Sequence, residues 1–101
     1  MNSKEKLLWV KIQHKAFARW INIQFENSGS KEVQRLRVRN LAKDLSDGVK
    51  LNYLVREISK GKYKKHFNAR PKFRIHYVDN ISCALEYLKS SGIRLHRIGA
   101  E

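Results

Sequence analysis

Cysteine, proline and acidic residues are scarce in this 101-residue sequence, which has one cysteine, one proline and nine acidic side chains. The single cysteine, Cys83, excludes an internal disulfide and is typical of a reducing compartment. No apolar run approaches the ~20 residues of a membrane-spanning helix. Lys11 and Lys15 interrupt the apolar residues near the N-terminus, so no signal peptide is expected. We therefore expect one soluble, cytoplasmic domain.

Motifs that carry chemistry are also missing. The sequence has no glycine-rich phosphate loop, no His–Glu metal motif and no pair of acids suited to acid–base catalysis. Its histidines lack the spacing of a zinc site, and one cysteine cannot complete a thiolate cluster. Asp47 and Gly48 lack the further oxygen ligands of a calcium loop. We therefore expect that the chain is not an enzyme and binds no metal or cofactor. We expect His76 to form a structural hydrogen bond and Cys83 to be a packed side chain within its helix.

Positive charge is abundant instead. The chain has 22 Lys and Arg residues against nine acids, which gives a net charge of +13. Such an excess indicates an acidic partner, and nucleic acid, anionic lipid and an acidic protein surface all satisfy this requirement. Charge by itself does not choose among them.

Residues 47–59 form the clearest helical pattern, around which the other helices are expected to pack. Asp47 precedes the apolar stripe and is suited to cap the first turn, while Gly61 follows it as a stop. The stripe, with its spacing of three and four residues, consists of Leu51, Leu54, Val55 and Ile58.

Two further helices are predicted, over residues 7–26 and 75–90, with residues 1–6 frayed and 91–101 as a tail. In the first helix, Phe17 and Trp20 have the spacing of core residues. Residues 31–43 are expected to form a short irregular helix or an ordered connector. In the last helix Ser91 and Gly92 provide the stop. The expected core face of that helix is Val78, Ile81, Ala84, Leu85 and Leu88. The fold class is therefore all-α.

Residues 60–74 are predicted to be a basic loop, because Gly61 and Pro71 interrupt any regular element there. Tyr63, Phe67 and Phe73 are spaced through it and are expected to pin it to the core. It contains no acid and seven basic residues: Lys60, Lys62, Lys64, Lys65, Arg70, Lys72 and Arg74. A solubilising loop would also be basic, but this many charges of one sign favour an acidic partner.

Three blocks of sequence resemble the calponin-homology domain, specifically the first domain of the tandem pair in actin-crosslinking proteins of the α-actinin, filamin and plectin type. Residues 15–22 read KAFARWIN, residues 44–59 read DLSDGVKLNYLVREIS, and residues 73–89 read FRIHYVDNISCALEYLK, with GIRL at 92–95. The resemblance covers about residues 11–101. It implies a helical bundle that, relative to the family pattern, is truncated before the last long helix.

The last long helix of the family pattern would bury about five large apolar side chains at roughly 1.5–3 kcal/mol each. That sum is comparable with the whole stability of about 5–15 kcal/mol of a domain. We therefore expect either marginal stability, association with another chain, or repacking of the first helix over the uncovered apolar groove. The expected groove residues are Leu51, Leu54, Val55, Leu85 and Leu88.

The resemblance implies a non-enzymatic module of the cytoplasmic cytoskeleton that binds filamentous actin, weakened by the missing helix. The positions that match actin-facing segments of the family are Gln13, Lys15, Arg19 and Asn22 in the first helix and Lys62, Lys64, Lys65, Arg70, Lys72 and Arg74 in the loop. The first-helix positions would equally suit an ordinary solvated face. Alternatives are a tubulin binder, a nucleic-acid or anionic-surface binder using the loop aromatics for stacking, and an assembly module that self-associates through the groove.

Overall fold

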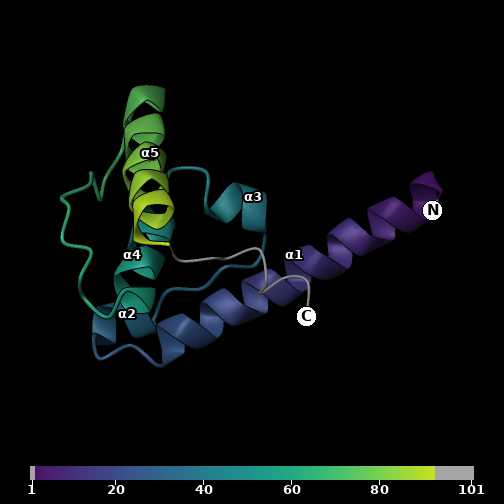
Figure 1. Cartoon of the computed structure of the whole chain (residues 1–101), viewed down its shortest axis with the longest axis horizontal. Helices are drawn as coiled ribbons and strands as arrows, with labels where there is room; N and C mark the ends of the chain where they lie inside the picture. The colour runs from purple at the N-terminus through teal and green to yellow at the C-terminus, as the bar shows by residue number, and fades with distance from the viewer. Residues whose placement is uncertain (1, 93–101) are drawn as a thin grey trace.

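A computed structural model describes residues 2–92 of the chain, and within that range it contains only helices and connecting segments (Figure 1). The helices are α1 (Ser3–Glu26), α2 (Lys31–Gln34), α3 (Leu41–Asp44), α4 (Val49–Ile58) and α5 (Arg74–Ser91). The all-α prediction is confirmed. Among the described residues, no helix is both long and apolar enough to cross a membrane.

Helix α4 lies at the centre and contributes to two apolar clusters. Its Leu54 packs with Ile21 and Phe25 of α1, and all three are fully buried. Its Val55 packs with Ala84 and Leu88 of α5. Phe17 and Trp20 are partly buried against the first cluster, as predicted, with ring centroids 5.8 Å apart. The remaining members of the first cluster are Ala18, Val33 and Val38.

The two ends of α4 follow the local signals in the sequence. Asp47 Oδ1 accepts a hydrogen bond from the Val49 N–H at 3.0 Å, so it bonds to the first turn as predicted, but the helix begins at Val49, after Gly48, and not at residue 47. Gly48 has a φ of +76°, and a Cβ atom there would lie 2.5 Å from the Asn80 Cβ, so both conformation and space require glycine. Gly61 ends the segment with a φ of +80°, and its N–H donates to the Arg56 carbonyl.

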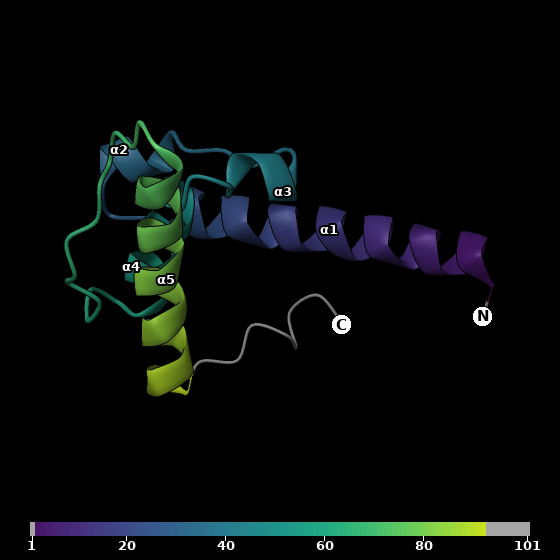
Figure 2. The same cartoon turned by 90° about the horizontal axis from the view of Figure 1, so that it is seen from above.

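Helix α1 begins earlier than the apolar pattern predicts. Asn2 Oδ1 accepts from the Glu5 N–H at 2.9 Å, and Glu5 Oε2 accepts from the Asn2 N–H at 3.3 Å. This reciprocal cap fixes the first turn, so residues 3–6 are helical and the prediction of a frayed segment is wrong for them. The half of α1 before Ala16 extends away from the body as an arm, and its side chains are exposed (Figures 1 and 2).

The predicted core face of α5 is partly wrong. Ala84 and Leu88 are buried, and so is the polar residue Asn80, whereas Val78 and Leu85 are each 52% exposed. Asn80 faces the interior because its side-chain amide forms hydrogen bonds there with the backbone of Asp47 and Asn68. Gly92, with a φ of +76°, ends α5 as predicted. The predicted tail from residue 93 onward lies outside the described residues.

The predicted apolar groove is wrong for most of its lining. Leu54 and Val55 have no exposed surface and Leu88 has little, because the anchored half of α1 covers one side of α4 and Tyr63 covers another. Leu85 alone among the five predicted residues is largely exposed. Leu85, predicted to be a core residue of its helix, therefore lies outside the interior that Trp20 and Leu54 share.

Candidate functional site

Residues 60–74 run from just after α4 to the first residue of α5 along the outside of these two helices, and this segment is named here the basic loop (Figure 1). Its six predicted site residues are all exposed: Lys62, Lys64, Lys65, Arg70, Lys72 and Arg74. Lys65 Nζ lies 3.9 Å from the Glu86 carboxylate, and both side chains are mostly exposed, so this pair contributes little to stability. The loop thus presents its positive charges to solvent.

Tyr63 anchors the first half of the basic loop. Its side chain is only 3% exposed, its ring packs against Tyr87 with centroids 4.9 Å apart, and its hydroxyl donates to Asn52 Oδ1. The Tyr63 N–H donates to Ser59 Oγ at 3.0 Å. Burial, followed by the proximity of Cys83, raises the pKa of Tyr63, while Arg56 acts weakly in the opposite direction. The hydroxyl therefore stays protonated and remains a donor to Asn52.

Phe67 anchors the middle of the loop through aromatic and cation–π contacts. Its ring meets Tyr53 of α4 edge to face at a centroid distance of 5.2 Å. The Arg56 guanidinium lies over the Phe67 ring at 4.7 Å and over the Tyr53 ring at 5.7 Å. Phe73, which was expected to pin the loop as well, is 65% exposed, and its ring lies beside the His76 ring with centroids 5.5 Å apart. The prediction for Phe73 is wrong.

Asn80 of α5 joins the loop to the start of α4. Its Nδ2 donates to the Asp47 carbonyl at 3.0 Å and to the Asn68 carbonyl at 2.8 Å, and its Oδ1 accepts from the Asn68 N–H at 2.9 Å. Asn52 Nδ2 donates in turn to the carbonyls of Gly48 and Asn80. We name this group the asparagine clamp. Sequence reasoning missed it, although a lone asparagine beside an apolar helical stripe was the available signal.

His76 fixes the loop's end at the beginning of α5. Its Nδ1 accepts from the backbone N–H groups of Lys72 and Phe73 at 3.2 and 3.4 Å. This is the structural hydrogen bond predicted for His76. With Tyr63, Phe67 and the asparagine clamp, it holds the basic loop at four places along its length.

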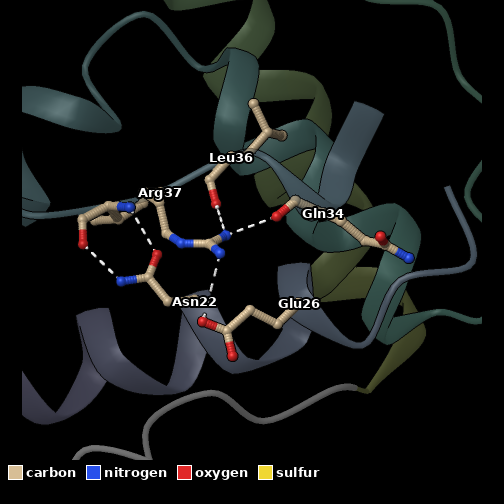
Figure 3. Close-up of polar contacts among 6 residues, drawn as sticks. Asn22, Glu26, Gln34, Leu36 and Arg37 are labelled. Carbon is tan, nitrogen blue, oxygen red and sulfur yellow. Dashed lines mark hydrogen bonds and ion pairs between the residues drawn. The ribbon is translucent and has the colours of Figure 1, made fainter. Parts of the chain in front are cut away.

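Three of the four predicted site residues in α1 are exposed, and the fourth is not free. Gln13, Lys15 and Arg19 point to solvent. Asn22 is partly buried because its Nδ2 donates to the Val38 carbonyl at 2.8 Å and its Oδ1 accepts from the Val38 N–H at 2.7 Å. Figure 3 shows this pair beside the connector. Asn22 is thus a structural pin, and its assignment to an open binding face is corrected.

Arg37 makes polar contacts within the connector, residues 31–43, and with α1 (Figure 3). Its Nη1 donates to the carbonyls of Gln34 and Leu36, each at 2.7 Å, and its Nη2 lies 3.6 Å from Glu26 Oε1. The connector over residues 31–43 is therefore ordered, with two short helices rather than one. Within residues 2–92 no three His, Cys, Asp or Glu side chains are grouped as metal ligands would be.

Comparison with known proteins places these features in one family. A profile of the calponin homology (CH) domain matches residues 11–101. The chain is 36% identical over 94 residues to cortexillin-1 of Dictyostelium discoideum, covering 92% of this chain and 20% of that protein. It is 37% identical over 94 residues to filamin-A of Drosophila melanogaster, with 93% and 4% covered. For human alpha-actinin-1 the values are 34% over 93 residues, with 92% and 10% covered.

The chain thus spans a fifth or less of the length of these relatives. The match nevertheless includes nearly the whole chain and all three sequence blocks that carry the resemblance. The chain therefore belongs to the calponin homology domain family, a non-enzymatic family, as its sequence predicted.

Proposed function

We propose that this chain is an actin-filament-binding module of the cytoplasmic cytoskeleton, and that the basic loop is its main contact surface. The observation that carries the proposal is the loop itself, which has seven basic residues and no acid and is held at four places. Membership of the calponin homology family and similarity to filamin and alpha-actinin support an acidic protein filament as the partner.

The physics of such a contact is cumulative. An exposed ion pair contributes about 0–1 kcal/mol, so several together can reach a few kcal/mol at low salt. The Debye length is about 8 Å at physiological ionic strength, so the attraction should weaken as salt is added. Because the loop is already ordered by Tyr63, Phe67 and Asn80, binding would lose less conformational entropy than binding by a free segment.

Gln13, Lys15 and Arg19 of α1 belong to the proposal as a further contact region. Asn22 does not, because both polar groups of its side chain are used by Val38. Substituting Lys15 or Arg19 should therefore affect binding, whereas substituting Asn22 should affect stability.

Binding of single-stranded nucleic acid by stacking has less support. Base stacking needs aromatic faces that are open to solvent. Tyr63 is buried and Phe67 lies under the Arg56 guanidinium, which leaves Phe73 as the open aromatic ring of the loop. The basic loop therefore favours a partner recognised by charge and shape.

Cosedimentation with filamentous actin at high speed, over a series of salt concentrations, tests the proposal. The loop variant replaces Lys62, Lys64, Lys65 and Lys72 by Gln. A matched control replaces the exposed Lys4, Lys6, Lys31 and Lys89 by Gln, which removes the same charge elsewhere. We expect the loop variant to bind about 10- to 30-fold more weakly than the wild type, and the control variant to bind within about threefold of it.

Absence of the wild-type protein from the actin pellet at low salt would refute the proposal. Equal weakening in the loop and control variants would also refute it, because net charge rather than the loop would then determine binding. Parallel measurements with microtubules and duplex DNA identify the polymer. Preference for microtubules would replace actin by tubulin, and equal affinity for DNA and actin with equal salt slopes would indicate a non-specific polycation.

A further inference from the structure

The large apolar side chains that the described residues expose are gathered on two helices. Ten such side chains are exposed, and eight of the ten lie on the arm of α1 or on α5. On the arm they are Leu7, Leu8, Trp9, Val10 and Ile12, and on α5 they are Ile75, Val78 and Leu85. Single exposed apolar residues are ordinary, but residues gathered in this way mark a surface that another molecule covers.

The exposed apolar residues of α5 lie on the side that faces away from α4. The side that packs on α4 carries three buried residues at steps of four, Asn80, Ala84 and Leu88. Ile75, Val78 and Leu85 follow one another at steps of three and seven, so they form a stripe on the other side of the helix. We name these three residues the α5 stripe. They are 64%, 52% and 52% exposed, so the described part of the chain leaves the stripe open.

The arm of the same chain does not cover the α5 stripe. Helix α1 is continuous over 24 residues, about 36 Å, and its second half is fixed to α4 by Ile21 and Phe25. The arm continues that half and extends away from α5 in both views (Figures 1 and 2). A helix without a break does not fold back on its own body. The apolar residues of the arm and of α5 therefore need a second molecule to cover them.

Charges beside the two apolar surfaces are complementary. Asp79 and Glu86, which are exposed and seven residues apart, border the α5 stripe. Lys4 and Lys11, also exposed and seven residues apart, border Leu8 on the arm. Seven residues of helix measure about 10.5 Å, so the spacing of the two acids matches that of the two lysines. The arm of one copy thus has the charge and the apolar residues that the α5 stripe of another copy requires.

Helical geometry also sets the direction of this pairing. At about 100° per residue, seen from the N-terminus of each helix, the acids lie to one side of the α5 stripe and the lysines lie to the opposite side of Leu8 and Ile12. Two such faces bring acids and lysines together when the helices run parallel. Glu86 already lies 3.9 Å from Lys65, but both side chains are mostly exposed, so this weak pair does not prevent a second contact.

We infer that two copies of the chain form a symmetric dimer in which the arm of each copy lies along the α5 stripe of the other. A two-fold axis that bisects the angle between the arm and α5 exchanges the directions of the two helices, so a single rotation forms both contacts. Together the contacts would bury on the order of 1,200 Å², which reaches the standard size of a stable interface. The dimer requires no actin, so it is independent of the proposed function.

Sedimentation velocity over a series of protein concentrations tests the exchange of arms. Physiological salt is used because a Debye length of about 8 Å screens the net charge of +13 on each copy. The arm variant carries Lys4→Glu and Lys11→Glu, and the stripe variant carries Asp79→Lys and Glu86→Lys. Each variant alone places like charges at both contacts, so we expect its dimer to dissociate with a Kd at least about tenfold higher than that of the wild type.

An equimolar mixture of the two variants is the decisive sample. In a mixed dimer, the acidic arm of the arm variant meets the basic α5 of the stripe variant, and the lysine arm of the stripe variant meets the acidic α5 of the arm variant. The mixture should therefore dimerise with a Kd within about threefold of the wild-type value. A control variant with Lys31→Glu and Lys43→Glu has the same net charge as the arm variant, and it should dimerise like the wild type.

A wild type that sediments as one chain up to about 1 mM overturns the inference. A mixture that stays monomeric overturns it too, because the interface then lies elsewhere. Hydrogen exchange gives a separate readout, since amides of the arm should gain protection as the wild-type concentration rises, and a dimer whose arm gains none contradicts the exchange. Circular dichroism verifies folding, and if a double variant unfolds, the single changes Lys11→Glu and Glu86→Lys are used. Actin cosedimentation tests the proposed function separately.

Discussion

The asparagine clamp allows a test of how the basic loop is held. Replacing Asn80 by Ala removes three hydrogen bonds, two donated by Nδ2 to the carbonyls of Asp47 and Asn68 and one accepted by Oδ1 from the Asn68 N–H. The side chain is only 2% exposed, so water does not easily replace these partners. The loop should consequently detach from α4 and α5 near Asn68.

The expected size follows from the number of bonds. A typical hydrogen bond contributes about 1 kcal/mol, so three lost bonds lower the free energy of unfolding by roughly 3 kcal/mol. This is a large part of the 5–15 kcal/mol that a domain of ordinary stability has. For a domain of about 100 residues, each kcal/mol shifts the Tm by about 4–8 °C, so the Tm should fall by about 12–24 °C.

Hydrogen exchange and limited trypsin digestion of the folded protein distinguish a local from a global effect. The backbone amide of Asn68 should lose protection, and trypsin should cleave the lysines and arginines of the loop faster than in the wild type. Ser82→Ala, an exposed substitution on the same helix, is the matched control and should change neither. Unchanged protection and stability in the Asn80 variant would show that the clamp does not hold the loop.

Four further predictions concern single residues. Asn22→Ala should lower the free energy of unfolding by about 2 kcal/mol in a urea titration, with actin affinity of the folded variant unchanged. Tyr63→Phe should cost about 1–3 kcal/mol by leaving Asn52 without its donor. The pKa of Tyr63 is raised in the folded protein, so the protonated hydroxyl stabilises the fold below pH about 10. This stabilisation is lost as the pH rises through the folded pKa. The Tyr63→Phe variant should therefore lose less stability than the wild type when the pH is made alkaline. The pKa of Asp44 is lowered in the folded protein, so its carboxylate stabilises the fold above pH about 3.8, and this stabilisation is lost as the pH falls further. Asp44→Asn should therefore make the free energy of unfolding less dependent on pH in the acid range. Gly48→Ala should cost about 3 kcal/mol through strain and the 2.5 Å clash with Asn80 Cβ, against about 1 kcal/mol for Gly61→Ala, where nothing lies within 4 Å.

Local chemistry made several features predictable from sequence. Asp47 and Gly61 bound the central helix because each acts on its own neighbours in the chain. Tyr63 and Phe67 could be expected to anchor the loop because large aromatic side chains seldom stay in water when a core is near. The exposure of the loop lysines followed from their charge in the same way.

Features that depend on distant partners could not be predicted. Asn80 is buried because it hydrogen-bonds to backbone groups that lie 12 and 33 residues away in the sequence. The spacing of apolar residues instead predicts that Val78 and Leu85 face the interior. Asn22 has the spacing of the exposed residues of α1 but bonds to Val38, 16 residues later. The periodicity of a sequence shows which side chains are apolar. Whether a side-chain amide is buried depends instead on the backbone groups that the fold places within hydrogen-bond distance of it.

The arm of α1 has one further consequence. The side chains before Ala16 are exposed and none of them belongs to the apolar cluster that anchors α1, so the arm is ordered by its backbone hydrogen bonds and by the Asn2–Glu5 cap. The anchored half already supplies a nucleus, and each additional residue adds one hydrogen bond to a helix that exists. Warming should therefore shorten α1 gradually from Ser3 inward, and the arm's length is set by temperature while the body is still intact.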